Sequence, residues 1–156
     1  MSILRAALTS GSLYVAGDII NQTIQHQSVD WKQTAKFGLI GFTCHGPYFR
    51  YGLNWLERFG TGTNLKTVLI KSFAGQGIVF PPYIALFLGY SAILDSKDPI
   101  QNIKDKYITI FTKGWLVWPF ANMVNFSLVP PPMRLAFINL VGIGWNSYLS
   151  FAAYKS

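Results

Sequence analysis

Residues 72–94, SFAGQGIVFPPYIALFLGYSAIL, decide the fold, because these 23 consecutive residues include no charged side chain. Residues 114–133 and 135–154 are two further uncharged segments of 20 residues each. The hydrocarbon core of a bilayer is ~30 Å thick and a helix rises ~1.5 Å per residue, so about 20 residues cross it. Each of the three segments is therefore long enough to span a membrane as a helix.

Two earlier apolar segments each contain charged residues. Residues 3–25 hold Arg5 near their start and Asp18 inside, and residues 37–56 hold Arg50. Most of the remaining charged side chains lie in short connectors between the five segments. Apolar stretches that alternate with short charged connectors are typical of a helical protein that crosses the bilayer several times.

The composition supports the same interpretation. Charged residues make up 12% of the 156 residues and hydrophobic residues 51%, whereas soluble proteins carry roughly 25% charged residues. The apolar content excludes a disordered chain, and the single cysteine, Cys44, excludes a secreted domain held by disulfides. We therefore predict an all-α fold, a polytopic transmembrane bundle of four to five helices that forms one integral membrane domain over residues 1–156.

The charge distribution and the absence of enzyme motifs exclude several classes of function. The formal net charge is +7, but the basic residues are spread over several connectors and form no stripe with base-stacking aromatics, which argues against nucleic acid. Lys and Arg beside spanning segments contact lipid headgroups, so we expect membrane lipids as partners. The two histidines and one cysteine lack the spacing of a zinc site, and no glycine-rich phosphate loop precedes a helix. We expect neither an enzyme nor a cofactor, and His45 is expected to be a buried polar residue.

Two proline clusters should shape the helices. Pro81 and Pro82 are expected to kink a spanning helix, because proline removes a donor and clashes with the preceding turn. Pro130–Pro132 should end one helix and start another. The sequence thus predicts helices over residues 107–129 and 133–154 that are joined by a tight corner.

Close helix packing in a bilayer depends on small residues, because lipid provides no hydrophobic drive between helices. Two sets of small residues recur at helical spacing and would let neighbouring backbones approach. They are Ala35, Gly38 and Gly41, and Gly77, Pro81, Ala85 and Gly89.

Polar side chains inside the apolar segments are the candidate functional residues. A charged group that faces lipid costs about 2.5–3.5 kcal/mol on insertion, so such residues usually face the interior of a bundle. Helical spacing places them on inward faces, where they would form a polar seam. They are Asp18, Gln22, Arg50, Gln76, Asn122, Asn125, Arg134, Asn139 and Asn146.

Two interpretations of the seam stay open. In the first, the seam lines a water-filled path for small polar solutes, and its acid and bases set which charges pass. Replacement of Asp18 by Asn should then change the ion preference. In the second, Asp18 pairs with Arg50 or Arg134, and the amides form hydrogen bonds between helices, worth ~0.6 kcal/mol each on average.

The C-terminal third resembles a known family. The matching motifs are Trp118-Pro119, Asn125-Phe126, Val129-Pro130, Arg134 and the run WNSYLS at 145–150. This order resembles the signature of the family of the twenty-two-kilodalton peroxisomal membrane protein, which includes the mitochondrial inner-membrane protein linked to mitochondrial DNA depletion. Upstream, similar family motifs are Gly17-Asp18 with Gln22, Gly46-Pro47 followed by residues 56–59, and Gln76 with Pro81.

The chain departs from the family pattern in three places. Gly52-Leu53 stands where the family usually has Trp-Tyr, and Gly75 stands where it usually has Asp. Because Gly17-Asp18 comes early, we expect no counterpart of the family's amphipathic N-terminal stretch.

The resemblance implies a small helical protein of the mitochondrial inner membrane, with the peroxisomal membrane as the alternative. It also implies a weakly selective channel for small metabolites that supports mitochondrial homeostasis. The alternative function is a structural accessory subunit of a larger inner-membrane respiratory complex. The expected assembly is accordingly a homo-oligomer or a larger membrane complex.

Overall fold

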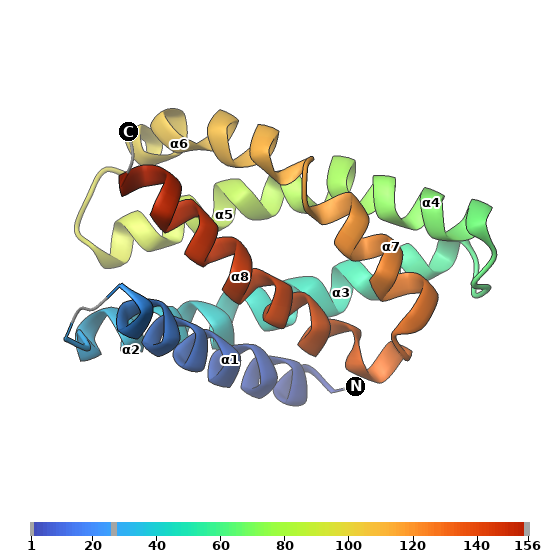
Figure 1. Ribbon diagram of the computed structural model, residues 1–156, viewed down its shortest axis with the longest axis horizontal. Coiled ribbons are helices and arrows are strands. Elements are labelled where there is room, and N and C mark those ends of the chain that lie inside the picture. Colours follow the sequence, from blue (N-terminus) through green and yellow to red (C-terminus); the bar gives the residue numbers. More distant parts are fainter. Residues whose placement is uncertain (1, 26–27, 155–156) are drawn as a thin grey trace. The chain divides into compact units, whose positions relative to one another are not determined.

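The computed structural model describes residues 2–25 and 28–154, with side chains described as far as Ser147, and every regular element in these residues is helical. The all-α prediction is confirmed (Figure 1). The α-helices are α1 Ile3–Ile24, α2 Trp31–Ile40, α3 Gly46–Leu56, α4 Leu65–Ala74, α5 Phe80–Leu94, α6 Pro99–Gly114, α7 Trp118–Leu128 and α8 Arg134–Tyr154.

Short π-helical and 3₁₀ segments join several of these helices. The π segments Gly41–His45 and Gly75–Val79 connect α2 to α3 and α4 to α5, and 3₁₀ turns cover Glu57–Phe59 and Pro131–Met133. The described residues therefore form six continuous helical stretches, one more than the upper predicted number. By length and composition, two of these stretches, Ile3–Ile24 and Leu65–Leu94, are long and apolar enough to cross a membrane.

Side-chain caps explain where four helices begin. The side-chain oxygens of Ser2, Asp30, Asn64 and Asp98 accept hydrogen bonds from backbone N–H groups in the first turns of α1, α2, α4 and α6. Such caps satisfy donors that have no partner inside the helix, and each contributes about 1 kcal/mol. The polar residues that precede these helices thus fix their starts.

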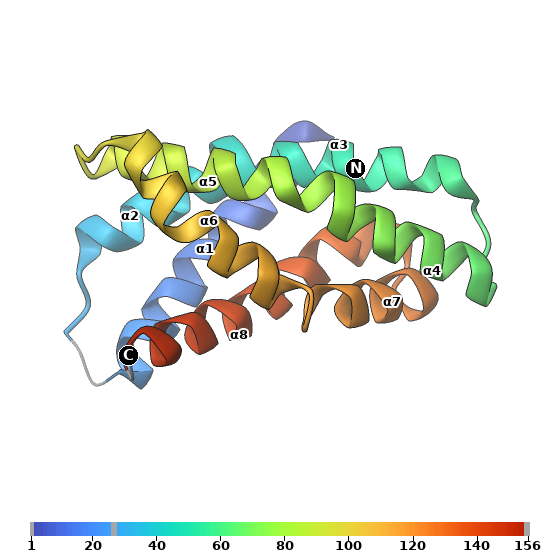
Figure 2. The ribbon, with the colours of Figure 1, turned by 90° about the horizontal axis from the view of Figure 1, so that it is seen from above.

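Both π segments have the same relation to glycine and proline. Gly41 and Gly75 open the two segments, and Pro47 and Pro81 each follow six residues later. The ring of a helical proline clashes with the preceding turn and removes one donor. The extra residue of the π turn accommodates this clash without ending the helix. The predicted distortion at Pro81 is therefore present, while α4 and α5 stay continuous (Figure 2).

The break in the next helical stretch corrects the prediction of one helix over residues 107–129. α6 ends at Gly114, a turn covers residues 115–117, and α7 begins at Trp118 (Figure 2). Pro119 lies in the first turn of α7. The N–H groups of a first turn have no acceptor inside the helix, so the missing N–H of a proline costs no hydrogen bond there. In an unbroken helix the same ring would clash with the carbonyl of Trp115. The single proline Pro119, and neither of the two proline clusters, thus marks the break in the predicted helix.

The chain divides into two compact units. The first consists of residues 1–47 and 135–156, and the second consists of residues 48–134. The first unit therefore combines both ends of the chain, whereas the second unit is one continuous segment.

Within the first unit, α1 packs closely on α2 and the π segment that follows it. A Cβ atom added to Gly41 would lie 2.7 Å from the backbone oxygen of Ser10, and one added to Gly46 would lie 2.5 Å from that of Ala6. The predicted close approach at Gly38 and Gly41 is confirmed, since a Cβ at Gly38 would lie 2.7 Å from Val15. Only glycine permits this separation of the two backbones.

Within the second unit, α6 lies along α5 and α7 lies along α4 (Figure 2). The amide of Asn102 donates to the Leu88 carbonyl at 2.9 Å and ties α6 to α5. The hydroxyl of Tyr48 donates to the Val79 carbonyl at 2.6 Å and ties α3 to the π segment. A Cβ added to Gly89 would touch Ile103, but one added to Gly77 would meet no described atom within 4 Å. The second predicted set of small residues is thus a helix contact at Gly89 and not at Gly77.

Candidate functional site

The predicted seam residues belong to both units. The first unit contains Asp18, Gln22, Asn139 and Asn146, and the second contains Arg50, Gln76, Asn122, Asn125 and Arg134. Within each unit they form separate groups with different degrees of hydrogen bonding. The hydrogen bonding of each group decides what that group could do.

Asp18 is the centre of a fully hydrogen-bonded group in the first unit. Its carboxylate accepts from the amide of Gln22 at 2.6 Å, the hydroxyl of Thr34 at 2.6 Å and the amide of Gln33 at 2.8 Å. Asp18 and Gln22 are both buried. All three of these donors are neutral and come from α1 and α2. Arg50 and Arg134 belong to the second unit, so the pairing of Asp18 with either arginine stays a prediction.

A second group in the first unit connects α1, the π segment and α8. The hydroxyl of Ser10 lies 3.1 Å from Nδ1 of His45 and accepts a hydrogen bond from the amide of Asn139, also at 3.1 Å. That amide additionally donates to the Leu135 carbonyl at 2.8 Å. His45 is buried, as predicted. Asn146 lies further along α8 and is half-buried.

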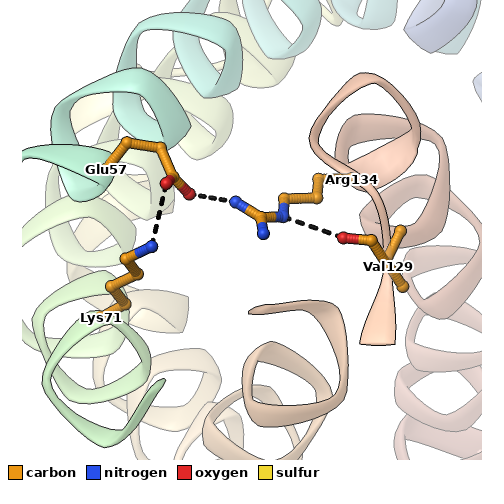
Figure 3. A network of polar contacts seen from close by, with 4 residues as sticks. All are labelled: Glu57, Lys71, Val129 and Arg134. Carbon is orange, nitrogen blue, oxygen red and sulfur yellow. Dashed lines mark hydrogen bonds and ion pairs between the residues drawn. The ribbon is translucent and has the colours of Figure 1, made fainter. Parts of the chain in front are cut away.

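A charged network lies in the second unit (Figure 3). Glu57 lies between two cations: its Oε2 is 2.9 Å from Nζ of Lys71, and its Oε1 accepts from Nη1 of Arg134. The Nε of Arg134 also donates to the Val129 carbonyl at 3.1 Å. Both cations lie over the ring of Phe126, at 5.4 Å for Lys71 and 5.2 Å for Arg134. We call Glu57, Lys71 and Arg134 the charged triad.

Sequence reasoning found only one member of the charged triad. Arg134 is one of the predicted seam residues, whereas Glu57 and Lys71 are not among them. Yet only 1% of the Lys71 side chain is exposed, against 28% for Glu57. Lys71 lies between the buried residues Val68 and Ser72 on one face of α4, and that helical spacing was the available signal.

A group of neutral amides lies on the facing surfaces of α7 and the α4–α5 stretch. A Cβ added to Gly75 would lie 3.5 Å from Nδ2 of Asn122, and one added to Gly114 would lie 3.3 Å from Nε2 of Gln76. Asn125 lies one turn after Asn122 on α7, and all three amide side chains are buried. We call Gln76, Asn122 and Asn125 the amide face.

Two members of the amide face lack hydrogen-bond partners. Gln76 and Asn125 are fully buried, and neither the oxygen nor the nitrogen of either side chain bonds to any described residue. A buried polar group without a partner costs about 1–3 kcal/mol. Four such atoms along one helix pair are therefore expensive unless water or a polar solute satisfies them.

Arg50 is half-buried and its guanidinium lies 5.3 Å from the centre of the Tyr51 ring. Within residues 2–25 and 28–154, no group of three or more His, Cys, Asp and Glu side chains is arranged to hold a metal ion.

The fold and the placement of polar groups define a class. Long apolar helices, glycine-mediated backbone contacts and buried polar groups on helix faces in the described residues are typical of small integral membrane proteins. Comparison with known proteins gives the family. The family model described as "Mpv17 / PMP22 family" matches residues 92–150. A relative in Neurospora crassa, "Protein sym-1", is 33% identical over 155 residues, which cover 96% of this chain and 90% of the relative. The chain belongs to the Mpv17/PMP22 family.

Two further relatives support the family assignment. A Dictyostelium discoideum protein named "PXMP2/4 family protein 4" is 30% identical, over 92% of this chain and 82% of its own length. A Danio rerio protein named "Mitochondrial inner membrane protein Mpv17" is 29% identical, over 95% of this chain and 88% of its own length. No solved structure matches the chain. The family assignment and the mitochondrial inner-membrane location predicted from the sequence are both confirmed.

Proposed function

We propose that this protein is a weakly selective channel for small polar metabolites in the mitochondrial inner membrane. The observation that carries the proposal is the amide face, where Gln76 and Asn125 present four buried polar atoms without a protein partner. Water or a passing solute would satisfy these atoms. Because an amide both donates and accepts and carries no charge, such a lining favours polar solutes while discriminating little between ions.

The remaining predicted seam residues have a different role in this proposal. The carboxylate of Asp18 accepts three hydrogen bonds, one of them from Gln22. Groups that are already satisfied within the protein gain little from a solute. We therefore assign Asp18 and Gln22 to helix packing and Gln76, Asn122 and Asn125 to the path.

Conductance and stability together test the amide face. The purified full chain is reconstituted in planar bilayers, and its variants Gln76→Leu and Asn125→Leu are compared with it. We expect the conductance to fall severalfold in both variants, because an apolar side chain dewets the path. The matched control is Gln101→Leu, which makes the same kind of change at an exposed position on α6; its conductance should be unchanged.

The opposite result has a clear physical meaning. If the amides are only poorly satisfied packing groups, their replacement by leucine removes about 1–3 kcal/mol of desolvation cost each. The variants would then unfold at a higher temperature while conducting as the parent chain does. That combination would refute the proposed path.

A structural accessory subunit of a larger inner-membrane complex is the second candidate. The hydrogen-bonded group around Asp18 favours it, because polar groups that are satisfied within the chain act as packing contacts. Native electrophoresis after gentle detergent extraction separates the two candidates. Co-migration with a large respiratory assembly, together with no conductance by the isolated chain, would favour the subunit. Migration alone or as a small homo-oligomer would favour the channel.

A further inference from the structure

We propose that the charged triad binds the phosphate group of an anionic ligand, either a soluble phosphorylated metabolite or the headgroup of an anionic lipid. The proposal does not rest on the channel, because binding is measured without transport. It rests on the charge, the burial and the donor geometry of Glu57, Lys71 and Arg134.

The triad carries more positive than negative charge. Lys71 and Arg134 share a single carboxylate, that of Glu57, so the formal charge of the three side chains is +1. The two cations are almost fully buried, with 1% and 8% of their side chains exposed. Buried charges are normally paired, because removing an ion from water costs several kcal/mol. The triad therefore lacks one negative charge, which a bound anion would supply.

Donors for such an anion are present. Nε and Nη1 of Arg134 are engaged with Val129 and Glu57, while Nη2 makes no hydrogen bond to any residue that the structure describes (Figure 3). The ammonium of Lys71 has three N–H groups, and Glu57 accepts one of them. Guanidinium and ammonium groups form strong, charge-assisted hydrogen bonds with phosphate oxygens.

The surroundings of the triad also favour an anion. Glu57 follows the end of α3, Arg134 begins α8, and Glu57 is the most exposed member of the triad. Two exposed basic residues are close in the chain: Arg58 directly follows Glu57, and Lys66 lies at the start of α4, five residues before Lys71. Basic residues at the ends of membrane helices attract anionic headgroups and raise the local concentration of soluble anions.

The alternative is that the charged triad is a structural ion-pair network that binds no ligand and tolerates its formal charge of +1. The two interpretations differ most at Glu57. Glu57→Gln removes the internal carboxylate and raises the formal charge of the site from +1 to +2. A phosphate site would then bind phosphate more tightly, whereas a structural network would only lose stability.

The experiment measures the unfolding temperature of the purified full chain in a maltoside detergent, which contains no phosphate. Sodium phosphate is one probe, compared with sodium chloride at equal ionic strength. Micelles doped with phosphatidylglycerol are the other probe, compared with micelles doped with diacylglycerol, which lacks the phosphate. A ligand that binds only the folded chain raises its unfolding temperature in proportion to occupancy.

The variants give the expected order. Lys71→Met should weaken binding of the effective probe by about tenfold, since it removes one charge-assisted hydrogen bond. Arg134→Lys, which keeps the charge and loses the planar fork, should weaken it less. Glu57→Gln should give a larger shift than the parent chain. Lys66→Gln is the matched control, because it removes one exposed positive charge near the triad, and its response should equal that of the parent.

Each outcome decides something. A response to both probes supports the phosphate site, a response to phosphatidylglycerol alone assigns it to lipid, and a response to inorganic phosphate alone assigns it to soluble metabolites. No response of the parent chain to either probe overturns the proposal. So does an equal response of Lys71→Met and Lys66→Gln. Should Lys71→Met fail to fold, a Glu57→Gln response no larger than that of the parent overturns it.

Discussion

At the residue scale, Asp18 illustrates how a buried acid is held by neutral donors. Gln22, Gln33 and Thr34 approach its two oxygens from α1 and α2. Three neutral donors therefore satisfy the two oxygens of one buried carboxylate. An amide in the same place would present an NH₂ group to at least one of these donors, so the site is specific for the carboxylate.

This arrangement predicts the result of Asp18→Asn. We expect the free energy of unfolding to fall by about 1–3 kcal/mol, because one donor of the surrounding group would face another donor. The reversal potential across a salt gradient should be unchanged, since Asp18 is assigned to packing. Thermal unfolding in detergent and bilayer recording measure the two effects.

The matched control is Asp105→Asn, which changes an exposed carboxylate that accepts from Gln101 at 2.7 Å. It should alter neither quantity. A reversal potential that shifts in Asp18→Asn but not in Asp105→Asn would show that Asp18 lines the conduction path.

The sequence predicted the candidate residues better than their partners. Helical spacing correctly placed Asp18, Gln76 and Asn125 on buried faces, because that placement follows from one helix at a time. Their partners depend on which helices meet, and no period in the sequence reports that. The choice of Thr34 for Asp18, and of Glu57 for Arg134, is therefore a tertiary result.

At the scale of elements, the glycine that opens a π segment has two functions. Gly41 lets the helix absorb the following Pro47, and it also lets α1 approach to within backbone contact. The proline was visible in the sequence, but a single helix pattern does not distinguish a kink from a π turn. The break before α7 was missed for a related reason, because one proline within an apolar segment is compatible with either a kink or a helix start.

The close approach predicts a contrast between two glycines. Gly41→Ala should lower the free energy of unfolding by about 1–3 kcal/mol, because its Cβ would lie 2.7 Å from the Ser10 backbone oxygen. Gly142→Ala in α8 should raise it by about 0.5–1 kcal/mol, because alanine favours the helix and no described atom lies within 4 Å of the added Cβ. Urea or thermal unfolding of both variants in the same detergent measures the contrast.

Equal effects of the two substitutions would contradict the close packing of α1 on the π segment. Gly144→Ala is a useful repeat of the control, since its added Cβ also meets no described atom within 4 Å.

At the scale of the whole molecule, the first unit joins segments that are far apart in the sequence. α8 contacts α1 through Asn139 and Ser10, and through Ile143 and Gly17, where an added Cβ would lie 2.7 Å from the isoleucine Cγ1. Composition and periodicity predicted both helices. They gave no indication that the first and last helices pack together.

A double-mutant cycle tests this long-range contact. Gly17→Ala should lower the free energy of unfolding by about 1–3 kcal/mol through overpacking. Ile143→Ala creates space and should lower it by about 2–5 kcal/mol. The double variant should be more stable than the sum of the two losses predicts, because the smaller side chain removes the clash. Additive losses would show that the two residues do not touch.

The division of the chain also determines the order in which its parts can be completed during synthesis. The second unit is continuous, so a nascent chain contains all of it once residue 134 has been made. The first unit also includes residues 135–156, so residues 1–47 cannot complete their packing until the C-terminal residues have been synthesised. A premature stop codon shortly after residue 134 would thus yield a chain that holds every residue of the second unit but lacks the α8 part of the first unit. Residues 1–47 would then lose the helix that packs on them, so we expect late truncations to lower the amount of the protein rather than to alter its activity.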